Sequence, residues 1–383
     1  MTTFFAFDEL TWPEVADLPR SIPLVLPLGS GHARDDLARA LGDPPHVGLL
    51  PPLPYGWPGS GLTVSERVLC SFLANLLDCL RADGFTRVAV LAPPGCDLGL
   101  GEEQIVLPTR AQPQAEGGIP VVGRVAIVPC GHTEQHGYHL PLSTDTLIID
   151  AIARGVAAAI PDLAIALPTL PYGVSTHRAS FAGTFNAGGR VFEDFCLAVI
   201  DALVARGCDQ LYLLSGHGGN VSFLVNVVKY AGERHRRIFC ATSWLYLSGP
   251  AGAAALAARR RSPVGGMGHA CELETSLLLH LRPDLVRMER AVDDMDFVAT
   301  PAYFMDWIEG GALIANPPWD DDTITGAYGA PSLATAENGR FWLAAAIAEK
   351  VAHIAEIREQ HARREQRRRA GYGRWGTACT ADV

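Results

Sequence analysis

VAIVPCGHTEQHGYHLPLSTD, residues 125–145, is the stretch around which the chain is organised. It opens with an apolar run of strand type, VAIVPC, and Glu134, His136 and Asp145 follow beyond that run. Carboxylates and imidazoles crowded just past a buried strand are costly to desolvate unless a partner compensates them, which a divalent metal ion does well. Glu134 and His136 are two residues apart, so in extended backbone they project to the same side, and a loop can fold Asp145 back beside them. The stretch therefore predicts a metal site, with a polar loop capping a sheet as the alternative.

The composition describes a soluble globular protein. The chain has 383 residues, 48% of them hydrophobic and 19% charged, which is enough for one large or two ordinary domains. The net charge of −10 argues against a nucleic-acid or anionic-membrane partner. Nine cysteines are scattered without a CxxC pair, the N-terminus has no signal-peptide pattern, and no apolar run is long enough to span a membrane. We therefore expect a cytoplasmic protein that acts on a small molecule.

Strand-like and helix-like segments alternate along the chain, which predicts a mainly parallel sheet covered on both faces. Binding sites in such sheets lie beyond the carboxyl ends of the strands, where the polar turns of this chain fall. The expected strands are 22–31, 46–55, 87–92, 125–130, 163–170, 210–214 and 237–244, and the expected helices are 64–82, 146–160, 191–206 and 220–236.

Early segments of the chain recur later. LPPLPYG at 50–56 returns as LPTLPYG at 167–173, identical at six of seven positions. VLPLGS (25–30) parallels IVPCGH (127–132), and RADGFTRVAVLAPPG (81–95) parallels VARGCDQLYLLSGHG (204–218). The same order of elements therefore occurs twice, which indicates a duplication.

The first copy lacks the chemistry of the second. His32 stands roughly where Glu134 does, and Pro94 takes the place of His217. We therefore predict that the first copy is degenerate and non-catalytic and binds no metal. It should pack against the catalytic copy, because half-domains of this kind cannot bury both sheet faces alone. The predicted boundaries are 1–95 for the degenerate copy, 96–122 for a Gly- and Pro-containing linker, 123–355 for the catalytic domain and 356–383 for a C-terminal tail.

Two further motifs carry candidate ligands. His217 lies in SGHGGN, a strand-to-helix turn where glycines let backbone and ligand approach closely. GGMGHACELETS (265–276) holds His269, Glu272 and Glu274, and in a helix His269 and Glu272 would share a face. The alternative for these carboxylates is stabilisation by the helix dipole alone. Glu134, His136, Asp145, His217 and Glu272 together form the mixture that a pair of Zn²⁺, Mn²⁺ or Fe²⁺ ions favours.

The motifs GHTEQHGYHLPLSTD, YGVSTH, SGHGGN, GHACELETS and GAYGAPSLATAENGR (326–340) resemble the creatininase family of metal-dependent amidohydrolases. The likeness covers about residues 122–350, with the motifs in the same order. It implies an α/β/α sandwich, a binuclear metal site, a homo-oligomer and hydrolysis of a cyclic amide or other C–N bond. The expected cofactor is two divalent ions per chain, with zinc first and manganese or iron as alternatives.

The resemblance also implies roles for individual residues. Glu134, Asp145 and His217 would hold one metal, and His136 and Asp145 the other. Creatininase has a glutamate where this chain has Gly219, so Glu272 is expected to replace it as the fifth ligand. His269 would be catalytic with Glu274 beside it, and the expected substrate-binding residues are Ser175, His177, Gly218 and Trp244.

The departures from the family pattern limit the choice of substrate. Gly218 and Gly219 argue against creatinine itself. Other branches of the family deformylate a pyrimidine intermediate, open oxidised inositol rings or trim a ribosomal peptide. We expect an amidohydrolase acting on non-peptide C–N bonds, with a peptide-trimming enzyme or a non-catalytic subunit as alternatives.

Overall fold

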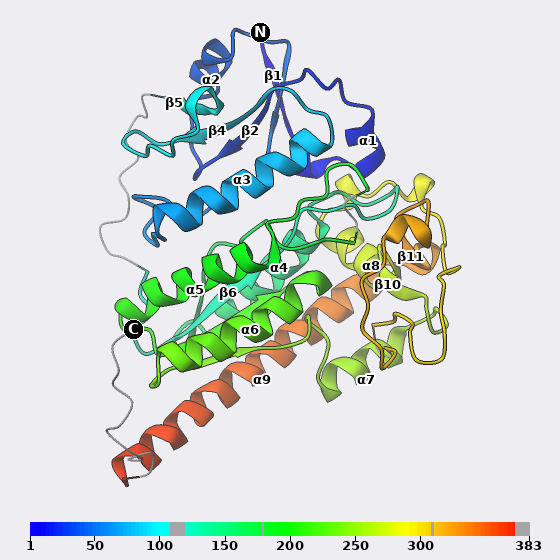
Figure 1. Cartoon of the computed structure of the whole chain (residues 1–383). Helices are drawn as coiled ribbons and strands as arrows, with labels where there is room; N and C mark the ends of the chain where they lie inside the picture. Colours follow the sequence, from blue (N-terminus) through cyan, green and yellow to red (C-terminus); the bar gives the residue numbers. More distant parts are fainter. Residues whose placement is uncertain (108–118, 178–179, 308–309, 372–383) are drawn as a thin grey trace.

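The computed structural model describes residues 1–107, 119–177, 180–307 and 310–371. Within these ranges, two parallel sheets lie one above the other and share a core (Figure 1). Short 3₁₀ turns lie at Phe7–Glu9, Gly101–Glu103, Pro283–Leu285, Met288–Arg290, Trp319–Asp321 and Pro331–Leu333. None of the helices in the described ranges is long and apolar enough to cross a bilayer.

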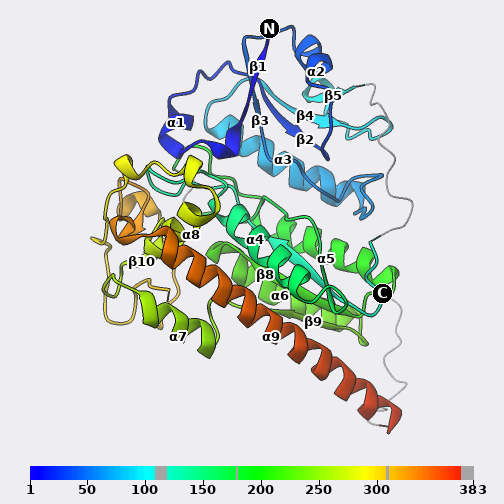
Figure 2. The same cartoon turned by 180° about the vertical axis from the view of Figure 1, so that it is seen from behind.

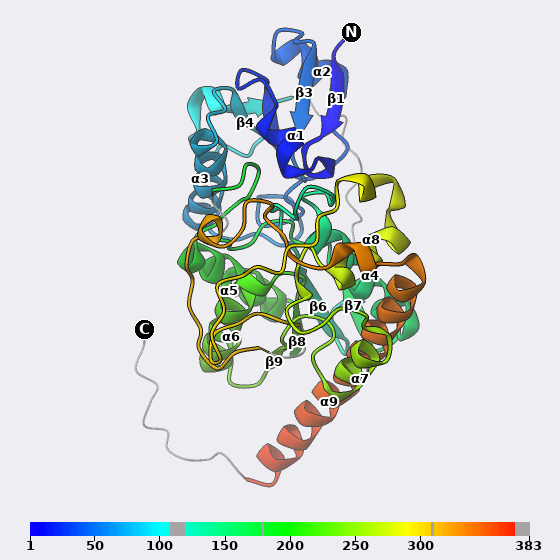
Figure 3. The same cartoon turned by 90° about the vertical axis from the view of Figure 1, so that its right-hand side faces the viewer.

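The larger half of the chain has the three-layer arrangement expected from the sequence. Its sheet runs in the order β7 (Ala164–Ala166), β6 (Val125–Cys130), β8 (Gln210–Ser215) and β9 (Phe239–Thr242), all parallel. Helices α5 (Gly189–Ala205) and α6 (Gly218–Arg234) cover one face, and α4 (Thr144–Ala159) and α9 (Ala336–Arg369) cover the other (Figure 3). Figure 2 shows α9 crossing this face beside α4. The predicted α/β/α sandwich is confirmed.

Smaller elements close the carboxyl end of this sheet. The strands β10 (Met267–His269) and β11 (Tyr328–Gly329) pair antiparallel. Helix α8 (Glu272–Leu281) follows β10 and packs along α9, and α7 (Pro250–Arg259) packs on α9 as well. These elements bring the GHACELETS motif to the carboxyl end of β6.

The first sheet has the order β1 (Thr3–Ala6), β3 (His46–Leu49), β2 (Leu24–Pro27), β4 (Val88–Ala92) and β5 (Gln104–Val106), also parallel. Its helices are α1 (Trp12–Ala16), α2 (Arg34–Ala40) and α3 (Glu66–Ala82). Two strands of this sheet were not expected. β1 adds an edge, and β5 lies inside the predicted linker 96–122, so the first sheet extends further along the chain than predicted.

The strand order β3-β2-β4-β5 of the first sheet matches β7-β6-β8-β9 of the second. The turns after the paired strands also match, because the Leu53 N–H donates to Pro27 O at 2.9 Å and the Leu170 N–H donates to Pro129 O at 3.0 Å. We propose that the two sheets descend from one duplicated unit, as the repeated LPxLPYG predicts.

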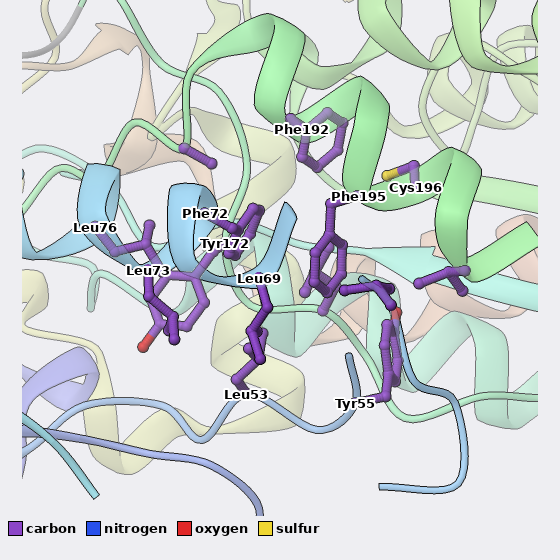
Figure 4. Packing of buried hydrophobic residues seen from close by; sticks show 14 of the residues in the cluster. Leu53, Tyr55, Leu69, Phe72, Leu73, Leu76, Tyr172, Phe192, Phe195 and Cys196 are labelled. Atoms are coloured by element: carbon purple, nitrogen blue, oxygen red, sulfur yellow. The ribbon is translucent and has the colours of Figure 1, made fainter. Parts of the chain in front are cut away.

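One of the hydrophobic clusters spans both halves, and between α3 and α5 its side chains pack together (Figure 4). Phe72 of α3 stacks on Phe195 of α5 with ring centroids 4.5 Å apart, and Tyr55 stacks on the same ring at 6.3 Å. The hydroxyl of Tyr172 donates to Pro51 O at 2.6 Å. Because these contacts are buried and cross from one half to the other, separating the halves would expose apolar side chains of both.

Replacing Phe195 by alanine should therefore destabilise both halves together. We expect the free energy of unfolding to fall by about 3–5 kcal/mol, because the fully buried ring leaves a cavity. Denaturant unfolding followed by tryptophan fluorescence would measure this loss, with Tyr230→Ala on exposed α6 surface as the control. Two separate transitions in the wild-type protein would contradict a shared core.

A cavity of about 780 Å³ lies beyond the carboxyl ends of the first sheet. Its walls are the turn after β2, with Ser30 and His32, the prolines after β3, and the face of α4 that carries Asp150 and Arg154. It occupies the place in the first sheet that the metal-site motifs occupy in the second.

Candidate metal centre

The candidate site lies where β6 and β8 end side by side. Loop 131–143 joins β6 to α4, and Gly216 joins β8 to His217, the residue just before α6. The Gly216 N–H donates to Cys130 O at 2.8 Å, and the Glu134 N–H donates to Leu142 O at 3.1 Å, so the loop folds back on itself. This return places Asp145, at the start of α4, beside Glu134 as the sequence predicts.

Four of the predicted ligands meet at short range. The Nδ1 atom of His217 lies 3.0 Å from Oε1 of Glu134 and 3.2 Å from Oδ2 of Asp145. The other oxygen of Asp145, Oδ1, lies 3.2 Å from Nε2 of His136. Asp145 therefore contacts one imidazole with each oxygen, which is the position of a carboxylate that could serve two ions.

The backbone decides which nitrogen of each imidazole carries the proton. The His217 Nε2–H donates to Val174 O at 3.0 Å, and the His136 Nδ1–H donates to Glu134 O at 3.1 Å. A carbonyl oxygen only accepts, so in the neutral rings the remaining nitrogens carry lone pairs. These lone pairs point at carboxylate oxygens in a fully buried site, an arrangement that repels unless a cation lies between them.

The pKa shifts show the same demand for positive charge. Burial opposes protonation of His217, but Glu134 and Asp145 outweigh it and raise the pKa of His217 to about 9. Burial also opposes protonation of His136, and Asp145 again raises its pKa above the usual value. Imidazole nitrogens and carboxylate oxygens at these distances suit a divalent ion of the zinc, manganese or iron type, so the residues fit the implied metals.

Glu274 joins this cluster. Its Oε1 lies 3.9 Å from Nε2 of His136, and ligand atoms of His136, Asp145 and Glu274 lie within 4.8 Å of one another. Glu134, His136 and His269 form a second such group, and His132, Glu134 and His217 a third. All of these side chains are buried.

Glu272, the expected fifth ligand, belongs to none of these groups in the described residues. Its buried carboxylate accepts the backbone N–H groups of Arg261 and Ser262, at 3.0 and 2.9 Å. The expected helical face shared with His269 is absent because α8 begins at Glu272 and His269 ends β10. The structure thus corrects the sequence interpretation and groups Glu274, instead of Glu272, with the other candidate ligands.

This placement predicts different outcomes for the two glutamates. Glu272→Gln should lower the free energy of unfolding by about 1–3 kcal/mol, because an amide N–H₂ would then face backbone donors. Metal content should stay at the wild-type level. Glu274→Gln is the matched comparison and should lower metal affinity instead. Elemental analysis and denaturant unfolding of both variants test this, and metal loss from Glu272→Gln would restore it as a ligand.

His269 approaches the cluster from β10. Its Nε2 lies 2.8 Å from Gln135 O and 3.2 Å from the side-chain amide nitrogen of Gln135, and at the shorter contact the carbonyl can only accept, so Nε2 donates. Its Nδ1 lies 3.9 Å from Oε1 of Glu134. Trp319 stands edge-on to the His269 ring with centroids 5.0 Å apart. The Gln135 side chain donates to Gly326 O at 2.7 Å. Gln135 and Trp319 were not singled out from the sequence, since their contacts join segments far apart in the chain.

The expected substrate-binding residues fall into two places. His177 is half-buried with its ring 5.5 Å from Trp319, so it adjoins the wall behind His269, and Ser175 is buried nearby in the chain. Trp244 is half exposed, and a Cβ on Gly218 would lie 3.9 Å from its ring. The roles of all four remain predictions.

Known proteins resemble the chain across the half that holds this site. The family model described as creatinine amidohydrolase matches residues 112–354. A mycofactocin precursor peptide peptidase of Mycobacterium tuberculosis is 32% identical over 247 residues, which cover 62% of this chain and 87% of that protein. A creatinine amidohydrolase of Pseudomonas putida is 31% identical, covering 44% of this chain and 68% of that protein.

The fold agrees with these matches. A solved structure designated "Creatininase Mn" superposes with a TM-score of 0.51 at 25% identity, covering 61% of this chain and 91% of that one. The matched half contains Glu134, His136, Asp145, His217 and Glu274, and the first sheet lies outside it. The chain therefore belongs to the creatininase family of hydrolases.

Proposed function

We propose that the protein hydrolyses a C–N bond of a small molecule, a cyclic amide, other amide or formamide, with two divalent ions as cofactor. Glu134, His136, Asp145, His217 and Glu274 would hold the ions. The observation that carries the proposal is the pair of imidazole nitrogens, one from His136 and one from His217, that face the two oxygens of Asp145 at 3.2 Å. Such ions, when bound, acidify water and polarise a carbonyl group.

The chain's own residues supply the proton transfer and the positioning. The Gln135 carbonyl accepts the Nε2–H of His269, so in the neutral ring Nδ1 carries the lone pair and faces Glu134. Nδ1 can take a proton from the attacking water and return it to the leaving nitrogen, as a general base and then a general acid. Trp319 stands against the His269 ring, holds its orientation and excludes water from that side.

Burial supports a small substrate. Glu134 and His136 are 0% exposed, Asp145 and His217 2%, and His269 3%. Sites for small molecules bury most of the ligand's surface, and groups at this depth suit such a substrate. The second candidate function is trimming of a ribosomal precursor peptide, which the likeness to the precursor peptide peptidase favours.

The proposal is tested with protein stripped by a chelator and reloaded with Zn²⁺, Mn²⁺ or Fe²⁺. Cyclic amides, formamides and short peptides would be offered in parallel and the products followed by mass spectrometry. We expect hydrolysis of a small-molecule class that depends on added metal. Cleavage of peptide ends alone would establish the second candidate. Failure to hydrolyse any class while holding two ions would favour a non-catalytic family member.

A further inference from the structure

His132 is a buried residue beside the candidate ligands to which no role was given above. It follows Gly131 directly, and Ser30 stands at the matching position of the first copy. Its ring stacks on His217 with centroids 4.4 Å apart, and its Nε2 lies 3.9 Å from Oε2 of Glu134. These distances admit two roles, a further metal ligand or a group that positions Glu134.

The hydrogen bond at the other ring nitrogen separates these roles. Nδ1 of His132 accepts the backbone N–H of Gly173 at 2.9 Å. A backbone N–H only donates, so Nδ1 carries the lone pair and the neutral ring must carry its proton on Nε2. A metal ligand needs a lone pair at the coordinating nitrogen. His132 therefore presents an N–H group to Glu134.

This arrangement is the reverse of that at His136, His217 and His269. Each of those rings donates one N–H to a backbone carbonyl and turns its other nitrogen toward the carboxylates of the cluster. Neighbouring residues of one loop set the contrast, since Gly173 donates its N–H to His132 and Val174 offers its carbonyl to His217.

Asn220 holds that loop in place. Its side chain accepts the Val174 N–H at 2.9 Å and donates to Gly131 O at 3.0 Å. A Cβ at position 173 would meet the Asn220 oxygen at 2.2 Å, so only glycine allows this approach. The backbone groups that select the two tautomers are thus held by side-chain contacts on both sides.

We infer that His132 is a positioning residue whose Nε2–H holds Oε2 of Glu134 and so directs Oε1 toward His217 and the ions. The separation of 3.9 Å closes to a hydrogen bond with a small tilt of the carboxylate. Carboxylate ligands of metals are commonly held by such donors, which tune metal affinity. This inference rests on the proposed function, because it needs Glu134 to bind metal.

Two variants separate the bonds that His132 makes. In His132→Gln the amide reaches about as far as Nε2, so the donor to Glu134 remains and the acceptor for Gly173 is lost. In His132→Asn the amide reaches only as far as Nδ1, so the acceptor remains and the donor is lost. Both amides are poor zinc ligands compared with imidazole. Zinc content at saturation and zinc affinity, measured by competition with a chelator, are the readouts.

We expect His132→Asn to bind two zinc ions with affinity lowered by about 10- to 100-fold, and His132→Gln to stay close to the wild type. Loss of one ion from both variants would show that His132 is a ligand and overturn the inference. Weakening in His132→Gln alone would show that anchoring Gly173 is its whole role, and would also overturn it. Failure of the wild type to bind zinc would instead overturn the proposed metal site. Circular dichroism of the metal-free variants confirms that each is folded.

Discussion

Replacing Asp145 by alanine is expected to empty the site of both metal ions and abolish hydrolysis. Each oxygen of this carboxylate lies 3.2 Å from a nitrogen of a different imidazole, so one substitution removes a ligand from both sides. Elemental analysis of protein purified without chelator would show a fall from two ions per chain to nearly none.

Asp150→Ala is the matched control for this prediction. Asp150 also lies on α4 but pairs with Arg154 at 2.7 Å on the surface, away from the imidazoles. This variant should keep both ions. If Asp145→Ala kept its full metal content, the assignment of the centre would be wrong, whatever happened to the activity.

His269→Ala should keep both metals and lose most activity, by a factor of about 10²–10⁴ as is usual for a general acid or base. Its Nδ1 is 3.9 Å from Glu134, further than the 3.0 Å that separates His217 from the same oxygen. That difference favours proton transfer over metal binding as its function. Metal content and turnover are measured on the same preparation.

The control for His269 is His280→Ala, an exposed histidine on α8 that touches none of the cluster. It should leave both quantities unchanged. If His269→Ala lost metal in proportion to activity, His269 would be reassigned as a ligand. This outcome is a real alternative because ligand atoms of His269, Glu134 and His136 lie close together.

The sequence was sufficient for the elements that rest on local patterns. The alternation of apolar runs with helical periodicity predicted the strands on either side of Asp145 and His217, and the parallel order followed from it. Glu134, His136, Asp145 and His217 could be grouped because each lies just past the end of β6 or β8 or at the start of α4. Such positions converge in any parallel sheet.

The residue at which α8 begins, and so the direction of the Glu272 side chain, could not be predicted in the same way. Spacing alone allowed His269 and Glu272 to share a helical face, which would have made Glu272 a ligand. Ala270, however, has φ of 50°, a left-handed conformation that separates β10 from α8 and turns Glu272 toward the Arg261 and Ser262 backbone. Residues other than glycine rarely adopt this conformation, so the sequence gives no reason to expect it at Ala270.

Long-range pairing was the other source of error. β1 pairs with β3 across some forty residues of chain, with Thr3 opposite His46, and β5 is only Gln104–Val106. Neither segment is long enough for a periodic pattern to stand out from its surroundings. The tautomer of His132 likewise depends on Gly173, a partner that only the folded chain brings within reach.

The cavity at the end of the first sheet has a consequence for how this chain can change under selection. The buried contacts of α3 with α5 hold that sheet in place, whereas the turn carrying Ser30 and His32 meets open space. At this end of the first sheet, the residues that stabilise the fold differ from the loop residues that line the cavity. Substitutions in these loops therefore need not unfold the protein. The end of the first sheet is a scaffold onto which natural variation or an engineer can graft new chemistry, beside α4, the helix that carries Asp145.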